Sequence, residues 1–347
     1  MEVWRGRRVL VTGTTGFKGA WLAELLLGRG AEVVGIGLPP EQSDALSVLL
    51  GLSGRIEERL IDLRDQDALT NAVAQASPEV VIHLAAQALV RRGHADPIGT
   101  WHTNVLGTVH LLEAVRATPG VRAVLVATTD KVYAGDHAAP HRETDRLGGR
   151  CPYSASKVAA EQAVLDARHR WARGRGLGLA TARAGNTLGG GDLADDRLVP
   201  DCVRAVRGGS ALSLRSPQAV RPWLHVLDVL DGYLRLADAL VASPGSWETI
   251  NLGPTGGDDL TVEAVARAVL AALGQPQALV VAPSDGPAER QVLRLDAGRA
   301  AELRWAPRLS TADALRWTAD WYAAWLGGAD PLSLCRQQIA EWDALQA

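Results

Sequence analysis

Short apolar runs alternate with helical patterns along the first half of this chain, and this alternation constrains the fold more than any other feature. The apolar runs occupy residues 7–13, 31–38, 59–65, 79–86, 121–130 and 177–186. Helical patterns lie between most of them, at residues 20–30, 67–76, 100–117 and 153–173. Strands that are apolar along their whole length are typical of parallel sheets covered by helices on both faces. We therefore predict an α/β fold with a Rossmann-like, doubly wound parallel sheet.

Three glycines, Gly13, Gly16 and Gly19, separate the first predicted strand from the first predicted helix. Glycines at such a junction let the backbone turn tightly and approach a pyrophosphate, and the helix N-terminus offers unpaired N–H groups. We therefore predict a dinucleotide site that includes Phe17 and Lys18 of the same loop.

The end of the second predicted strand bears on which dinucleotide binds. Residues 35–38 read Gly-Ile-Gly-Leu and contain neither an acid for a ribose 2′-hydroxyl nor an arginine for a 2′-phosphate. Lys18 is the only nearby cation in the sequence. We expect NAD rather than NADP.

The character of the sequence changes after Asn186. Residues 187–200 are rich in glycine and aspartate, and the tail alternates helical patterns with proline and glycine breaks. We predict an NAD-binding Rossmann domain at 1–186 with a returning segment at about 226–254, and a smaller, mostly C-terminal α/β substrate lobe at 187–225 and 255–347. The tail's tryptophans are interpreted as apolar packing.

Composition excludes several classes of protein. The net charge of −3 gives no basic field for nucleic acid or an acidic membrane surface. The three cysteines have no metal-binding spacing and read as reduced thiols, so no metal is expected. The first residues lack the apolar region of a signal peptide, and no apolar run is long enough to span a bilayer. A cytoplasmic location is the expectation.

Tyr153 and Lys157 open the long helical pattern that follows the fifth predicted strand. Residues four apart lie on one face of a helix, so both side chains can meet one ligand. A free tyrosine, with a pKa of about 10, is a poor base at neutral pH, whereas a neighbouring ammonium favours the phenolate. The pair therefore predicts a base that takes a proton from a hydroxyl group.

Thr129, Asp130 and Lys131 end the fifth predicted strand. Ligands in open parallel sheets bind at the carboxyl ends of strands, so these residues should point toward the cofactor crevice. An acid beside a second ionisable group suits the protonation of a leaving hydroxyl and the removal of a neighbouring proton. A surface ion pair is the alternative interpretation.

These motifs together resemble the extended short-chain dehydrogenase/reductase superfamily, and within it the CDP-glucose branch of the sugar-nucleotide 4,6-dehydratases. The resemblance rests on residues 83–116, 142–161, 182–205 and 221–238 as well as on the glycine loop. It implies a catalytic set of Thr129, Asp130, Lys131, Tyr153 and Lys157. It also implies cofactor contacts from Asp62, Leu63, Leu84, Ala85, Ala86 and Thr103, besides the glycine loop, Tyr153 and Lys157.

The resemblance further implies a nucleotide-sugar substrate, with CDP-glucose preferred. Its contacts would come from Gln87, Arg91, Asn186, Arg197, Arg215, Arg221 and His225. Arginine forks suit the oxygens of a diphosphate. A homodimer would form when the two long helical patterns pair across a two-fold axis into a four-helix bundle.

The implied reaction is loss of water from the sugar through bound NAD. Tyr153 would take the 4-hydroxyl proton, Lys131 the proton on carbon 5, and Asp130 would protonate the departing 6-hydroxyl. A nucleotide-sugar 4-epimerase or reductase is the alternative, because it shares the glycine loop and the Tyr-Lys pair without needing Asp130 and Lys131. A non-catalytic cofactor-binding regulatory protein is the second alternative.

Overall fold

The computed structural model describes residues 2–135, 139–214, 216–256, 260–281 and 290–345. Its residues divide into a larger unit of 1–134, 144–183 and 230–250 and a smaller unit of 135–143, 184–229 and 251–347. Residues 135–143 thus belong to the smaller unit, although the sequence places them within the Rossmann domain. Within the described residues, none of the helices combines the length and apolar character needed to cross a membrane.

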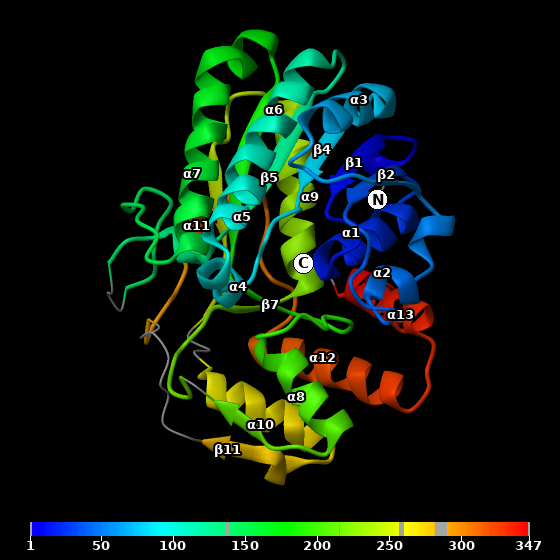
Figure 1. Cartoon of the computed structure of the whole chain (residues 1–347), viewed down its shortest axis with the longest axis vertical. Coiled ribbons are helices and arrows are strands. Elements are labelled where there is room, and N and C mark those ends of the chain that lie inside the picture. Colours follow the sequence, from blue (N-terminus) through cyan, green and yellow to red (C-terminus); the bar gives the residue numbers. More distant parts are fainter. Residues whose placement is uncertain (1, 136–138, 215, 257–259, 282–289, 346–347) are drawn as a thin grey trace. The chain divides into compact units, whose positions relative to one another are not determined.

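Seven strands form the main sheet, in the order β10-β6-β5-β4-β1-β2-β3. Figure 1 labels β1, β2, β4 and β5 of this sheet. The strands are β1 (Arg8–Thr12), β2 (Glu32–Gly37), β3 (Glu57–Leu60), β4 (Val80–His83), β5 (Ala123–Thr129), β6 (Gly178–Ala184) and β10 (Thr249–Leu252). β1 pairs in parallel with β2 and β4, β2 with β3, and β4 with β5. The chain therefore builds outward from β1 in one direction and then returns to β4, so the strand order reverses between β1 and β4. This confirms the predicted doubly wound, Rossmann-like sheet.

The helices of this part of the chain lie between the strands, as the alternation predicts. They are α1 (Phe17–Gly28), α2 (Leu46–Leu49), α3 (Gln66–Ala76), α4 (Val90–Ala95), α5 (Pro97–Trp101), α6 (Gly107–Ala117), α7 (Pro152–Ala167) and α9 (Val226–Ala242). Short turns of other helix types are η1 (Glu2–Trp4), η2 (Leu52–Gly54), η3 (His102–Leu106), η4 (Asp130–Val132), η5 (Arg168–Ala172) and η6 (Arg173–Arg175). The predicted helix at 100–117 contains a π-helical turn, η3, between α5 and α6. Such turns are often found at functional sites.

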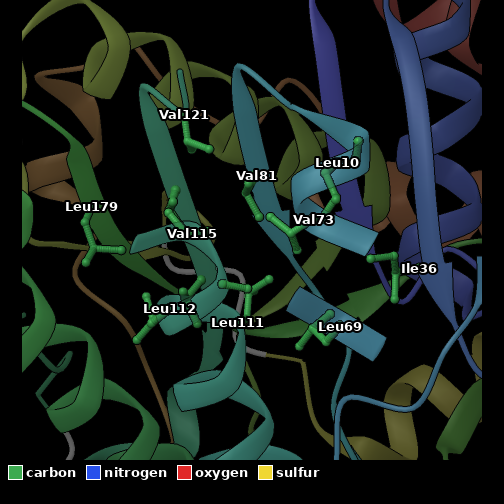
Figure 2. Packing of buried hydrophobic residues seen from close by; sticks show 14 of the residues in the cluster. Leu10, Ile36, Leu69, Val73, Val81, Leu111, Leu112, Val115, Val121 and Leu179 are labelled. Atoms are coloured by element: carbon green, nitrogen blue, oxygen red, sulfur yellow. The ribbon is translucent and has the colours of Figure 1, made fainter. Parts of the chain in front are cut away.

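One face of the sheet is covered by α3, α6 and α7. Figure 2 shows this cluster, in which leucine and valine side chains of the strands interdigitate with those of the helices. Leu10, Ile36 and Val81 contribute from the strands, and Leu69 and Leu111 from the helices. Val9 and Val11, whose side chains point to the opposite face, are as fully buried as Leu10. Burial on both faces explains why the central strands are apolar along their whole length. The edge strand β3 differs, because it spans Glu57–Leu60 rather than the predicted 59–65 and its residues are exposed or half-buried.

The smaller unit holds two short parallel strand pairs and most of the C-terminal helices. Its elements are β7 (Asn186–Leu188), α8 (Leu198–Gly208), β8 (Leu212–Leu214), β9 (Trp223–His225), α10 (Val262–Ala272), η7 (Pro276–Ala278), β11 (Leu279–Val281), α11 (Gly298–Ala301), α12 (Thr311–Leu326) and α13 (Pro331–Ala344). β7 pairs with β9, and β11 pairs with β8.

A buried carboxylate organises two of the tail's tryptophans. Asp228 is fully buried, and its Oδ1 accepts hydrogen bonds from Trp342 Nε1 at 2.9 Å and from the Arg308 backbone N–H at 2.8 Å. The Asp228 carbonyl accepts a third bond from Trp305 Nε1. Apolar packing alone is therefore an incomplete interpretation of these tryptophans, because two of them satisfy a buried acid and its backbone.

Candidate active site

The glycine loop lies at the point where the strand order reverses. Gly13 follows β1 with φ +84°, a conformation that glycine adopts without strain. A Cβ atom on Gly13 would lie 2.8 Å from the Ala85 backbone nitrogen, and one on Gly19 would collide with the Gly13 carbonyl. The loop after β1 and the loop after β4 are therefore in close contact, and the contact requires glycine.

The helix that follows this loop is arranged to meet an anion. Gly16 is the N-cap of α1, which consequently has no side-chain cap, and the first turn contains no acid. An uncapped N-terminus without negative charge suits a pyrophosphate, whose oxygens accept from backbone N–H groups. Phe17 and Lys18, both half-buried, form the first turn. These features fit the predicted dinucleotide.

The remaining predicted cofactor residues also lie in the larger unit. Leu84, Ala85 and Ala86 follow β4 and are half-buried, and Thr103 lies in the π-helical turn η3. Asp62 follows β3, but its carboxylate is held by the Arg64 guanidinium at 2.5 Å and by the Arg64 backbone N–H at 2.9 Å. These bonds to Arg64 lower the pKa of Asp62. Leu63, next to it, is buried.

Lys157 is a buried ammonium on the inner face of α7. Its Nζ donates to the Ala127 carbonyl of β5 at 3.2 Å. Burial lowers the pKa of Lys157 to about 8, and the negative charge of Glu161 one turn later opposes that decrease. Lys157 in turn helps burial to lower the pKa of His83 to about 3. His83 is therefore neutral, and its ring nitrogens contact the hydroxyls of Thr12 and Thr108.

Tyr153 is buried in the first turn of the same helix. The turn is fixed by a capping box in which the side chains of Cys151 and Ser154 each accept from the other residue's backbone N–H. The Tyr153 carbonyl accepts from Ser156 Oγ at 2.7 Å. Gly93 of α4 lies against it, since a Cβ there would come within 3.3 Å of both the Tyr153 Cβ and backbone nitrogen. The tyrosine is thus held from two sides.

Asp130 and Lys131 form the short turn η4 directly after β5. Only 1% of the Asp130 side chain is exposed. Its Oδ1 contacts Lys131 Nζ at 3.1 Å and accepts from Thr129 Oγ1 at 3.0 Å. Its Oδ2 is also buried but has no hydrogen-bond partner among the described residues. A surface ion pair is therefore the wrong interpretation of Asp130, and a buried oxygen without a partner points to a ligand group.

A buried ion pair that the motifs did not reveal supports these residues. Arg183 Nε of β6 donates to Glu161 Oε1 of α7 at 2.9 Å, and Thr128 Oγ1 of β5 donates to the same oxygen at 2.6 Å. Arg183 Nη1 also donates to the Tyr133 hydroxyl at 2.9 Å. The only sequence signal was the spacing of Glu161, four residues after Lys157 and hence on the same helix face.

Two predicted substrate residues lie in the larger unit. Gln87 uses its side chain internally, since Nε2 donates to Thr100 Oγ1 at 2.9 Å and Oε1 accepts from the Leu89 backbone N–H at 2.6 Å. This amide therefore shapes the loop after β4. Arg91 lies on α4 and is exposed.

The other predicted substrate residues belong to the smaller unit. Asn186 opens β7 next to Trp223 of β9, and His225 ends β9. Arg221 is buried and donates to the carbonyls of Val220 and Arg290. His225 is fully buried, its ring meets Trp317 edge-on, and burial lowers its pKa to about 3.

Arg197 also belongs to the smaller unit. Its Nη1 contacts Asp192 Oδ2 at 2.9 Å, ahead of α8. Arg215 lies outside the described residues. Among the described residues, no group of three or more histidine, cysteine or acidic side chains could hold a metal ion.

Comparison with known proteins places these features in context. The profile of the NAD dependent epimerase/dehydratase family matches residues 9–253. CDP-glucose 4,6-dehydratase from Salmonella typhimurium is 38% identical, over 98% of this chain and 97% of that protein. A dTDP-glucose 4,6-dehydratase from Xanthomonas campestris is 28% identical, over 90% of this chain and 92% of that protein.

Solved structures share the fold over nearly the whole chain. A dTDP-glucose 4,6-dehydratase from Streptomyces venezuelae with NAD and TYD bound has a TM-score of 0.79 at 26% identity, covering 94% of this chain and 99% of that one. The UDP-glucose 4-epimerase of Thermus thermophilus in complex with NAD has a TM-score of 0.79 at 27% identity, covering 93% of this chain and 100% of that one.

Proposed function

We propose that this chain, which belongs to the NAD dependent epimerase/dehydratase family, is a sugar-nucleotide 4,6-dehydratase that converts CDP-glucose to CDP-4-keto-6-deoxyglucose. The observation that carries the proposal is the Asp130–Lys131 pair after β5. Asp130 is buried, with one carboxylate oxygen without a hydrogen-bond partner among the described residues. Loss of a hydroxyl as water requires an acid, whereas epimerisation at carbon 4 does not.

When bound at the glycine loop, NAD would supply the redox chemistry, as a hydride acceptor for carbon 4 of the sugar and a hydride donor for carbon 6. Tyr153 removes the 4-hydroxyl proton. Lys157, buried below it and bonded to the Ala127 carbonyl, provides the positive charge that favours the phenolate. Gln87, Arg91, Asn186, Arg197, Arg215, Arg221 and His225 remain the proposed substrate residues.

The ion pair of Asp130 and Lys131 can supply both remaining proton transfers. Lys131 Nζ is 3.1 Å from Asp130 Oδ1, close enough for a proton to pass from the ammonium to the carboxylate. That transfer produces a neutral amine and a carboxylic acid together. The amine then takes the proton on carbon 5, and the acid protonates the departing 6-hydroxyl. When carbon 6 becomes saturated, carbon 5 needs a proton, and the Lys131 ammonium gives back the proton that it took. Tyr153 then releases the 4-hydroxyl proton to solvent and Lys131 takes one up, so Lys131 is again an ammonium and Asp130 again a carboxylate.

The test is incubation of the purified protein and NAD with CDP-glucose, UDP-glucose and dTDP-glucose in parallel. Mass spectrometry follows the loss of one water from the sugar nucleotide, and absorbance follows NADH. Loss of water from CDP-glucose alone, without net NADH, is the expected result. Loss from another nucleotide would remove the cytidine assignment, and loss from none would overturn the dehydratase assignment.

Two variants separate the proposed reaction from the alternatives. Asp130→Asn keeps the shape of the side chain but removes the acid, so it should stop loss of water. In a 4-epimerase the same change would leave epimerisation in place. Tyr153→Phe should abolish turnover in either enzyme, whereas it would leave the partner interaction of a regulatory protein unchanged.

We also propose a homodimer formed through the helices around α5 and α7. Ile98, Trp101 and Leu106 are exposed on the run from α5 to α6, with 70% of Ile98 accessible, and Leu165 is exposed on α7. Large exposed apolar side chains gathered on neighbouring helices are typical of interaction surfaces. Light scattering after size exclusion should give twice the chain mass, and Ile98→Glu should give the single chain.

We further propose a cytoplasmic location, because the three cysteines are thiols rather than disulfides.

A further inference from the structure

The end of β2 lacks the group that usually recognises the adenosine ribose in a doubly wound dinucleotide site. In such folds an acid there accepts a hydrogen bond from the ribose 2′-hydroxyl of NAD, or an arginine donates hydrogen bonds to the 2′-phosphate of NADP. Here β2 ends at Gly37 and is followed by Leu38 and Pro39, whose side chains have no polar atom. The position is therefore neutral.

Two threonine hydroxyls of the glycine loop lie against this end of β2. A Cβ atom on Gly35 would lie 2.6 Å from Thr14 Oγ1, and one on Gly37 would lie 2.7 Å from Thr15 Oγ1. The glycines thus make room for the threonines, and a side chain at either position would force the neighbouring threonine to shift. Thr14 is buried, whereas Thr15 is half-buried and nearer the strand end.

The direction of the next side chain follows from the geometry of an extended segment. Successive side chains alternate between faces, so residue 39 shares the face of Gly35 and Gly37 and residue 38 points to the other. Proline keeps the residue before it extended, and Pro39 is itself followed by Pro40. Residue 39 is therefore expected on the same side as Gly37 and Thr15, just beyond the end of the strand.

Two acids near the end of β2 are already paired with arginines. Glu41, the next acid along the chain, contacts Arg92 Nη1 at 3.1 Å. Asp62, at the end of the neighbouring strand, is bound by Arg64. Among the described residues, a 2′-phosphate at the end of β2 would therefore meet no free acid that repels it and no free arginine fork that binds it.

We infer that the Thr15 hydroxyl takes the place of the missing carboxylate at the adenosine ribose, and that the site binds NADP with an affinity within about tenfold of that for NAD. The inference rests on the NAD site alone and not on the proposed dehydration. It concerns equilibrium binding, which can be measured without turnover.

The first test is calorimetric titration of nucleotide-free protein with NAD and with NADP. The wild-type protein should show dissociation constants within about tenfold of each other. Pro39→Asp should weaken NADP binding at least tenfold more than NAD binding, because the new carboxylate repels the 2′-phosphate. Pro39→Asn introduces a side chain with the shape of aspartate but without its charge. It should leave the ratio of the NADP and NAD dissociation constants as in the wild type.

Each outcome has a distinct meaning. A wild-type preference for NAD above about a hundredfold, or equal behaviour of the Asp and Asn variants, would overturn the inference. Binding of neither nucleotide would instead overturn the dinucleotide site on which the proposed function depends.

The second test concerns the hydroxyl itself. Thr15→Val keeps the shape of the side chain and removes the hydroxyl, so it should weaken both nucleotides about three- to tenfold, the value of one hydrogen bond. Thr15→Ser keeps the hydroxyl and should bind like the wild type. If the Thr15→Val protein binds both nucleotides as tightly as the wild type, the ribose contact is not made by Thr15.

Discussion

Replacing Glu161 with leucine should remove a large part of the stability of the larger unit. Glu161 and Arg183 are almost completely buried, with 5% and 4% of their side chains exposed. The carboxylate accepts two bonds from Arg183 Nε, at 2.9 and 3.1 Å, one from Nη2 at 2.5 Å, and one from Thr128. Glu161→Leu leaves the guanidinium in the interior without its counter-charge.

The expected magnitude follows from that geometry. Burial acts to lower the pKa of Arg183, but the hydrogen bonds and charge of Glu161 raise it above its ordinary value, so Arg183 keeps its charge. Removing one partner of a buried, hydrogen-bonded ion pair costs about 3–5 kcal/mol. Removing both with Glu161→Leu/Arg183→Leu should cost much less than the sum of the two single changes, because no buried charge is left.

Urea unfolding followed by circular dichroism measures these differences in the free energy of unfolding. The comparison requires that the slope of this free energy against urea concentration is the same in each variant. Arg116→Leu is the matched control, because Arg116 pairs with Glu113 on an exposed surface and its loss should cost less than about 1 kcal/mol. A loss below about 1 kcal/mol for Glu161→Leu, or a double variant that equals the sum of the single variants, would refute the reasoning.

Three further predictions concern the pH dependence of turnover, the pH dependence of stability, and the C-terminal helix. Turnover should fall as the pH rises through about 8, because Lys157 loses its proton there. Lys157→Arg should move this fall above about pH 10. A pH profile that stays unchanged in this variant would contradict the role of Lys157. The unfolded chain keeps the Lys157 proton up to about pH 10.5, so this residue makes stability rise, not fall, between about pH 8 and 10.5, which urea titrations at several pH values can check. Asp228→Ala should lower the free energy of unfolding by about 3 kcal/mol, because Trp342 Nε1 and the Arg308 N–H lose their acceptor. The same change should speed tryptic cleavage before α13. A free energy of unfolding within about 0.5 kcal/mol of the wild-type value would exclude this anchoring role.

The proposed catalytic residues could be identified from the sequence because their signals are local. Tyr153 and Lys157 are one helical turn apart, and Asp130 and Lys131 follow directly after an apolar strand. Helix periodicity and the rule for strand ends place such residues without knowledge of distant contacts. Their environment was not available in the same way. Whether Asp130 is a surface residue or a buried acid depends on the chain that packs over it.

Boundaries were less predictable where the backbone departs from regular geometry. The long helical pattern at 100–117 shows no break, yet the structure has the π-helical turn η3 within it. The pattern at 153–173 likewise ends as a regular helix at Ala167 and continues as short turns. Both departures preserve the hydrophobic periodicity approximately, so periodicity could not detect them.

Taken by itself, the sequence determined the central strands of the sheet, the glycine loop and the position of the Tyr–Lys pair, because burial on both faces and tight backbone turns impose residue types on contiguous segments. The edge strands were predicted less well: β10 was not predicted as a strand, and β3 lies at Glu57–Leu60 rather than at 59–65. Only the tertiary structure decided which polar groups share the interior. Glu161 meets Arg183 across 22 residues, and Asp228 meets Trp342 across 114. Such partners are selected by the geometry of packing and by the cost of leaving a buried charge unpaired, and neither leaves a periodic trace in the chain.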